Sequence, residues 1–396
     1  MHTRLLPRDG DEGGEFSRST TMYVQNLEEL CGTVRGHQDN SLMTTSSVKS
    51  ILSVNRSMWV AHGSPSTISI YDRDTLAQKP EVPLRDVTVN NMVMAGKQVW
   101  LATSGKDLVC INPVDPLFQR ELRGHASGGI VDLAFMGKSL WTVGVDQQIG
   151  VWNVETMKLR KMLKGSVMNC IVNVAGVAWI GTVRGIQRYD TATLKPIRDA
   201  PPDPANEGAA KYLKMPVTKL LLVNSYVWAV HHDESMISVW ESESKAFIAA
   251  FPAKNVVALL RVGPNVWTTS HNSLITCYDV KTFAKVGELS GIHQDWVTCM
   301  TLARYRDGLR VWSGSTDSTI VLWDPMCRPH EFLNVRGRTG ICDVCRRTFK
   351  PADDVLVCKN CKHYSLHSKC RELLQLGCTC AAKPALPAPS LTPDVV

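Results

Sequence analysis

The chain has 396 residues, of which 44% are hydrophobic and 20% charged, and its formal net charge is +7. This length allows more than one domain, and the hydrophobic fraction is ordinary for a soluble protein. The sequence contains no apolar run of the roughly 18 residues that a membrane-spanning helix requires, and residues 1–20 lack the apolar segment of a secretory signal, so we expect a cytoplasmic protein.

The 13 cysteines fall into two groups. Six are scattered singly over the first 330 residues, as expected for reduced, buried thiols of a cytosolic domain. The other seven lie between Cys342 and Cys380 with histidines among them, a pattern that fits a metal site better than a disulfide framework. Between Arg328 and Lys383, eleven Lys/Arg outnumber five Asp/Glu. We therefore expect the large N-terminal part to be near neutral and any attraction to anionic surfaces to come from the C-terminal part.

Residues 1–21 are polar, and we expect them to be disordered. From residue 22 onward, tryptophan recurs at intervals of 38 to 49 residues, each time in a short hydrophobic string. The seven tryptophans are Trp59, Trp100, Trp141, Trp179, Trp228, Trp267 and Trp312. A second, alternating string follows each of them, such as Ile149–Asn153 or Ile320–Asp324. Alternation with β-branched and aromatic residues predicts strands, and the Gly, Asp, Ser and Asn clusters between the strings predict tight turns.

Seven copies at this spacing indicate the blades of a β-propeller. Over residues 22–325 the sequence resembles the WD-repeat family, in the Gly-His pairs Gly36-His37 and Gly124-His125 and in the literal Trp-Asp pair Trp323-Asp324. The other repeats depart from these dipeptides. The resemblance implies an all-β fold with a seven-bladed propeller over residues 22–326.

The last repeat ends at Trp323-Asp324 after three strands. We expect residues 22–34 to supply the fourth strand, because pairing the two ends of the propeller hides an exposed sheet edge. The longest interval, between Trp179 and Trp228, contains residues 199–208, a Pro- and Asp-rich surface insertion of the kind that commonly contacts partners.

Two sets of side chains in the repeats have the composition of a catalytic triad. They are His125, Thr142, Asp146 and Trp152 in the third repeat, and His293, Ser313, Asp317 and Trp323 in the seventh. They resemble the structural hydrogen-bond set of WD repeats, so we expect them to be buried, to face one another and to catalyse nothing. His231-His232-Asp233 follows a strand and could bind a metal, but a solvated turn is the favoured interpretation.

From residue 330 onward the spacing of Cys and His predicts zinc. The expected ligands are His330, Cys342, Cys345, Cys358, Cys361, His367, Cys370 and Cys378. Zinc prefers four thiolate or imidazole ligands in a tetrahedron, and a two-residue gap lets both members of a pair face one ion. Eight ligands make two closed sites with no position for water, which indicates a structural role and not hydrolysis.

The order of these ligands resembles the phorbol-ester/diacylglycerol-type zinc finger of protein kinase C, over residues 328–380. The resemblance implies that His330, Cys358, Cys361 and Cys378 hold one zinc ion, and that Cys342, Cys345, His367 and Cys370 hold the other. His363 is the alternative to His367 as a zinc ligand if the register differs, and Cys380 is the alternative to Cys378. A RING- or PHD-like cross-brace is the alternative type of finger. The family's loop Gln is absent and Asp353-Asp354 is present, so the finger is an atypical member. The Ala/Pro-rich residues 381–396 are expected to be disordered.

The sequence as a whole predicts a non-catalytic intracellular scaffold in signalling. The propeller is expected to bind a protein partner. The finger is expected to dock on a partner or to make weak contact with an anionic membrane. The protein would then lie in the cytoplasm and at the membrane periphery. The alternative is a ubiquitin-ligase component whose propeller receives the substrate. No small-molecule substrate is expected, and a basic face without interleaved aromatic residues argues against nucleic acid.

Overall fold

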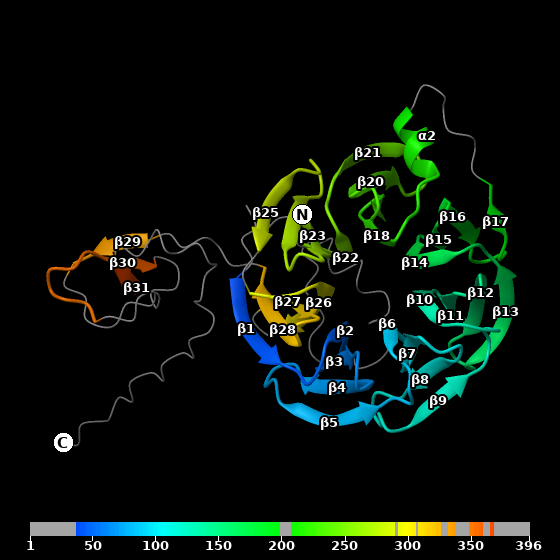
Figure 1. Ribbon diagram of the computed structural model, residues 1–396, viewed down its shortest axis with the longest axis horizontal. Helices are drawn as coiled ribbons and strands as arrows, with labels where there is room; N and C mark the ends of the chain where they lie inside the picture. The colour runs from blue at the N-terminus through cyan, green and yellow to red at the C-terminus, as the bar shows by residue number, and fades with distance from the viewer. Residues whose placement is uncertain are drawn as a thin grey trace, which may run out of the picture.

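The computed structural model describes residues 37–198, 207–289, 292–305, 308–325, 332–336, 348–358 and 365–367. Seven four-stranded antiparallel sheets follow one another around a ring, so the predicted seven-bladed propeller is confirmed (Figure 1). Within these ranges, no helix has both the length and the apolar character needed to cross a membrane.

Six blades are each formed by four consecutive strands. The first contains β2 (Val48–Val54), β3 (Ser57–His62), β4 (Thr67–Asp72) and β5 (Gln78–Pro83); the second β6 (Val89–Ala95), β7 (Gln98–Thr103), β8 (Leu108–Ile111) and β9 (Gln119–Leu122). The third contains β10 (Ile130–Met136), β11 (Ser139–Gly144), β12 (Gln148–Asn153) and β13 (Lys158–Lys164); the fourth β14 (Met168–Val174), β15 (Val177–Thr182), β16 (Gly185–Asp190) and β17 (Pro196–Ile197). The fifth contains β18 (Lys219–Val223), β19 (Tyr226–His231), β20 (Met236–Glu241) and β21 (Phe247–Pro252); the sixth β22 (Val256–Val262), β23 (Asn265–Ser270), β24 (Ile275–Asp279) and β25 (Lys285–Leu289). A short helix, α2 (Glu207–Leu213), lies between the fourth and fifth blades.

The seventh blade joins the two ends of the ring. Its strands β26 (Val297–Tyr305), β27 (Gly308–Ser315) and β28 (Thr319–Asp324) are completed by β1 (His37–Met43). β1 runs antiparallel to β28, with His37 opposite Asp324 and Met43 opposite Thr319. An N-terminal strand therefore closes the ring, as expected, but it comes from residues 37–43, while the predicted stretch 22–34 lies outside the described residues.

The position of this strand was missed for a physical reason. The sequence of β1, HQDNSLM, is polar and shows no alternation, so it carries no strand signal. Pairing along a sheet edge uses backbone N–H and C=O groups, which every residue other than proline offers. His37, one residue of the Gly-His pair matched to the family's turn, is instead the first residue of β1.

The seven repeat tryptophans fill the interfaces between blades. Each lies on the second strand of its blade and is at most 1% exposed. Trp59 packs in one cluster with Val99 and Leu101 of the next blade, and Trp312 packs with Val60 across the closing interface. The periodic tryptophans of the sequence are thus the core of the propeller.

Hydrogen bonds also link the innermost strands of neighbouring blades. The Asn90 side chain donates to the carbonyl of Ile130 (2.7 Å), and the Thr298 hydroxyl donates to the carbonyl of Val48 (2.6 Å). The second contact joins the seventh blade to the first, so the innermost strands reinforce the closure made by β1.

The blade register defines two faces of the ring. In the first blade, Val48 at the start of the first strand pairs with His62 at the end of the second, and Thr67 at the start of the third pairs with Pro83 at the end of the fourth. The connections that lead into the first and third strands therefore share one face, which we call the upper face. A separate three-stranded antiparallel sheet follows the propeller, made of β29 (Phe332–Val335), β30 (Val355–Cys358) and β31 (Ser365–His367).

The closing strand yields a direct prediction. A chain that starts at Thr44 lacks β1 and leaves the edge of β28 unpaired. Its melting temperature should fall by several degrees, because each kcal/mol of lost stability lowers the melting temperature of a large domain by roughly 2–4 °C. A chain that starts at His37 is the control and should melt near the full-length value. Equal melting of the two truncated chains in differential scanning calorimetry would contradict the role of β1.

Candidate functional site

The triad-like set of the third blade is a buried hydrogen-bond network. His125 Nδ1 lies 2.9 Å from Asp146 Oδ1, and His125 Nε2 lies 2.9 Å from the hydroxyl of Thr142. Trp152 donates its indole N–H to the same hydroxyl at 3.1 Å. His125 and Thr142 are 5% and 0% exposed. These groups face one another inside one blade, as predicted, and leave no face of the imidazole for a substrate.

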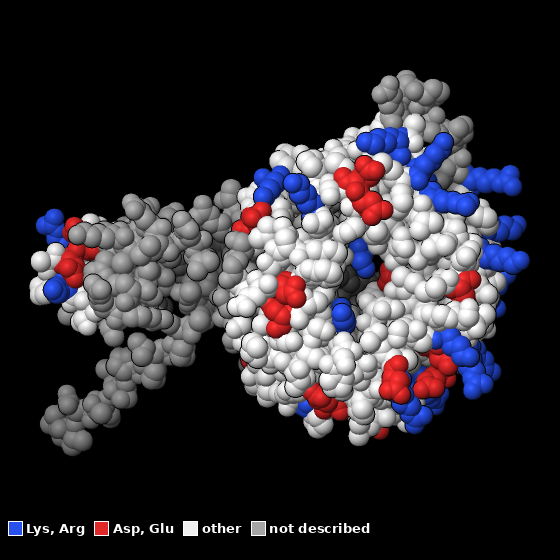
Figure 2. Space-filling view, in the orientation of Figure 1, with Lys and Arg blue, Asp and Glu red and all other residues white. Residues whose placement is uncertain are grey.

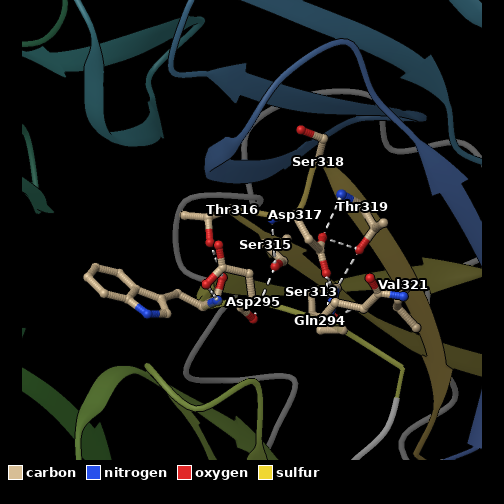
Figure 3. Close-up of polar contacts among 12 residues, drawn as sticks. Gln294, Asp295, Ser313, Ser315, Thr316, Asp317, Ser318, Thr319 and Val321 are labelled. Atoms are coloured by element: carbon tan, nitrogen blue, oxygen red, sulfur yellow. Dashed lines mark hydrogen bonds and ion pairs between the residues drawn. The ribbon is translucent and has the colours of Figure 1, made fainter.

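The seventh blade repeats the His–hydroxyl–Trp part of this arrangement, but His293 Nδ1 lies 2.8 Å from the Thr319 hydroxyl and 3.5 Å from Asp317. His293 Nε2 lies 2.7 Å from the hydroxyl of Ser313, to which Trp323 also donates, at 2.8 Å. Figure 3 shows Asp317 between Gln294 and Thr319, and its carboxylate accepts the backbone N–H groups of both, at 2.7 and 2.8 Å.

Burial and hydrogen bonds shift the pKa values of the two ionisable groups in this network. It lowers the pKa of His293, although Asp317 acts in the opposite direction, so the imidazole is neutral near pH 7. Partial burial raises the pKa of Asp317, but hydrogen bonds from Thr319 and Gln294 outweigh this effect and keep it below the usual value. The network ties the turn before β26 to β27 and β28 and serves stability.

Two more histidines have the same role and were not predicted. His62 lies 2.8 Å from the Ser69 hydroxyl, and His231 lies 2.7 Å from the Ser238 hydroxyl, which also accepts the indole N–H of Trp240. The interpretation of His231 as part of a solvated turn was wrong, because it is the last residue of β19 and only 1% exposed. A His followed seven residues later by a Ser on the next strand is the sequence signal that marks both.

The predicted zinc ligands fall almost entirely outside the described residues. The backbones of Cys358 and His367 are described, at the ends of the neighbouring strands β30 and β31. The side chains of these two and all of His330, Cys342, Cys345, Cys361, Cys370 and Cys378 are not described, so the two zinc sites stay a prediction. Among the side chains that are described, no three of His, Cys, Asp or Glu gather closely enough to hold a metal ion.

An aromatic cluster on the upper face is the best candidate for a docking site. Trp296 precedes β26 and is 48% exposed. The ring of His271, which follows β23, stacks on it with centroids 4.1 Å apart and an interplanar angle of 21°. His232, which follows β19, packs edge-on against His271 at 5.2 Å. We call these three residues, from three consecutive blades, the Trp296 surface.

The stacked rings are held in place by the blades beneath them. Thr316 N donates to the Trp296 carbonyl at 2.9 Å, and His271 N donates to the Asn255 carbonyl at 3.2 Å. Burial and the neighbouring His232 lower the pKa of His271, which favours the neutral imidazole under the indole. An indole fixed in an exposed position offers large contact area with little entropy left to lose, as at the centre of many protein interfaces.

No protein-family model matches the chain. Over 72 residues the chain is 36% identical to the transcription factor unc-37 of Caenorhabditis elegans, a match covering 17% of this chain and 11% of that protein. Over 72 residues it is 43% identical to Ras association domain-containing protein 5 of Mus musculus, covering 17% of each. The chain thus spans less than a fifth of the length of either relative. The seven blades and this partial likeness support a propeller of the WD-repeat type.

The network of the third blade generates a stability prediction. Thr142→Val removes the hydroxyl that serves both His125 and Trp152, so two buried polar groups lose a partner and the free energy of unfolding should fall by about 1–3 kcal/mol. Thr142→Ser keeps the hydroxyl, as Ser313 does in the seventh blade, and should cost less. Urea denaturation measures both variants, and a Thr142→Val variant as stable as the unaltered protein would show that these hydrogen bonds contribute nothing.

Proposed function

We propose that this protein is a non-catalytic scaffold whose propeller binds a protein partner through the Trp296 surface. The proposal depends on the half-exposed indole of Trp296, which stacks on His271, itself packed against His232. Aromatic anchors surrounded by fixed polar groups are typical of the residues that dominate binding energy in protein interfaces. A partner with an apolar side chain or a short aromatic segment fits this surface.

A second part of the proposal concerns the C-terminal region. The spacing of the eight expected ligands supports a double-zinc finger that docks on a partner or, weakly, on an anionic membrane. Zinc would then supply the folding free energy that a domain of about 50 residues with a small core lacks. The scaffold would work in the cytoplasm and at the membrane periphery.

The docking role predicts a selective loss of binding. Trp296→Ala should remove the anchor and weaken the complex by about 2 kcal/mol or more, which is roughly 30-fold. Phe118→Ala is a matched control, because Phe118 is 51% exposed and lies between β8 and β9, a connection that belongs to the opposite face. Quantitative proximity labelling in cells compares the full-length protein with both variants. Equal labelling by the Trp296 variant and the full-length protein would contradict the proposed surface.

The zinc proposal predicts a stoichiometry. The purified protein should contain two zinc ions per chain, and Cys361→Ser should lower this number while the melting temperature of the propeller stays unchanged. Cys380→Ser is the control, since Cys380 is the spare thiol and its loss should leave both ions bound. Elemental analysis with native mass spectrometry reads the count, and a value of one or zero in the unaltered protein would refute the double site.

A further inference from the structure

The outer edge of the third and fourth blades carries a concentration of positive charge that the overall composition conceals. Between residues 158 and 198 there are eight Lys/Arg and one acid, Asp190. That acid is engaged in its own turn, where it accepts hydrogen bonds from Thr193 and Ala192. A basic surface is therefore also present in the propeller, outside the C-terminal part from which attraction to anionic surfaces was expected.

The strand geometry exposes these charges together. β13 is the outermost strand of its blade, and a bulge at Arg160 leaves that residue without a partner on β12. The bulge places Arg160 and Lys161 next to each other on the exposed side, between exposed Lys158 and Lys164. Lys195 and Arg198 flank β17 on the neighbouring blade and are also exposed. We call these six residues the basic edge.

The two parts of the basic edge lie side by side on the ring. Figure 1 places β13 and β17 next to each other on the rim, and the Tyr189 hydroxyl of the fourth blade donates to the Lys164 carbonyl at 3.2 Å. Figure 2 shows Lys and Arg side chains projecting from this rim. Glu155, in the turn that leads into β13, is an exposed acid beside the stretch.

The other outer strands show that protecting a sheet edge does not require this charge. Exposed edges are commonly guarded by charged residues against pairing with other chains. β5, β9 and β25 each carry one cation and one acid, and in β25 the pair Lys285 and Glu288 forms an ion pair. β13 carries four cations and no acid. A charge of one sign on β13 points to an anionic partner.

Exposed aliphatic side chains on the upper face of the fourth blade, inward from the basic edge, indicate the kind of partner. Val167 and Val183 are 44% and 40% exposed, and the Val183 N–H donates to the Val167 carbonyl at 3.1 Å. Exposed Arg184 follows directly, and Lys164 precedes Val167 by three residues. Cations near exposed aliphatic groups fit the headgroup and upper acyl region of a bilayer. Single-stranded nucleic acid would instead require exposed aromatic rings. Both aromatic residues of this stretch, Trp179 and Tyr189, are buried.

We propose that the basic edge docks the propeller on a membrane surface rich in anionic lipid. This inference is independent of the Trp296 surface and of the zinc finger. The contact uses several long, exposed Lys and Arg side chains spread over two blades, so it recognises charge density and no single headgroup. It weakens steeply as salt rises.

The test uses the full chain and vesicles of phosphatidylserine with phosphatidylcholine. The variant Lys158→Gln/Arg160→Gln/Lys161→Gln/Lys164→Gln should bind these vesicles at least about tenfold more weakly at low salt. The control Lys79→Gln/Lys97→Gln/Lys254→Gln/Lys281→Gln removes the same charge from exposed residues elsewhere on the ring and should bind nearly as the unaltered protein does. Both variants keep the finger, so a difference between them cannot come from it.

Three results would overturn the proposal. One is equal vesicle binding by the two variants at matched melting temperatures. Another is binding of the unaltered protein to pure phosphatidylcholine as strong as to the anionic vesicles. The third is loss of binding to duplex DNA in the β13 variant with vesicle binding unchanged, which would identify the basic edge as a nucleic-acid interface.

Discussion

The packing of one tryptophan into each interface between blades is the contact on which the structure depends. Every blade alone is a small twisted sheet with two apolar faces, and it buries them only against its neighbours. The indole of Trp141 illustrates this, because it packs in one cluster with Ile180 of the next blade. A buried tryptophan removes about 150–250 Å² from water, and seven such rings around a closed circle leave no terminal blade with an uncovered face.

This rigid circle explains how residues distant in the sequence form a surface. His232, His271 and Trp296 come from three blades and meet because the interfaces beneath them fix each blade's orientation. The buried His–Ser/Thr–Trp networks hold the turns that lead into the strands. The side chains that resemble a catalytic set serve this structural task, and the proposed recognition of a partner depends on other, exposed side chains of the upper face.

The sequence predicted the features that recur and missed those that do not. The tryptophan period gave the number of blades, and the sets containing His125 and His293 were identified as structural. β1 was missed because edge pairing leaves no side-chain pattern, and His231 was missed because it was placed after the strand that it ends. The basic edge was not predicted because the net charge is a sum over many residues. It does not show which of them the fold brings together, as it does for β13 and β17. The finger's ligands rest on spacing alone.

The pairing of β1 with β28 has a consequence for the time course of folding. Thr44 and Ser318, joined by hydrogen bonds where the two strands meet, are 274 positions apart in the chain. Ribosomes add about 5–20 residues per second, so β1 leaves the ribosome many seconds before its partner exists. Six blades can assemble in order during that interval, but the ring stays open until β28 is made. The nascent chain therefore passes through a long-lived intermediate in which the ring is open. Its unpaired strand edge is a natural binding site for chaperones.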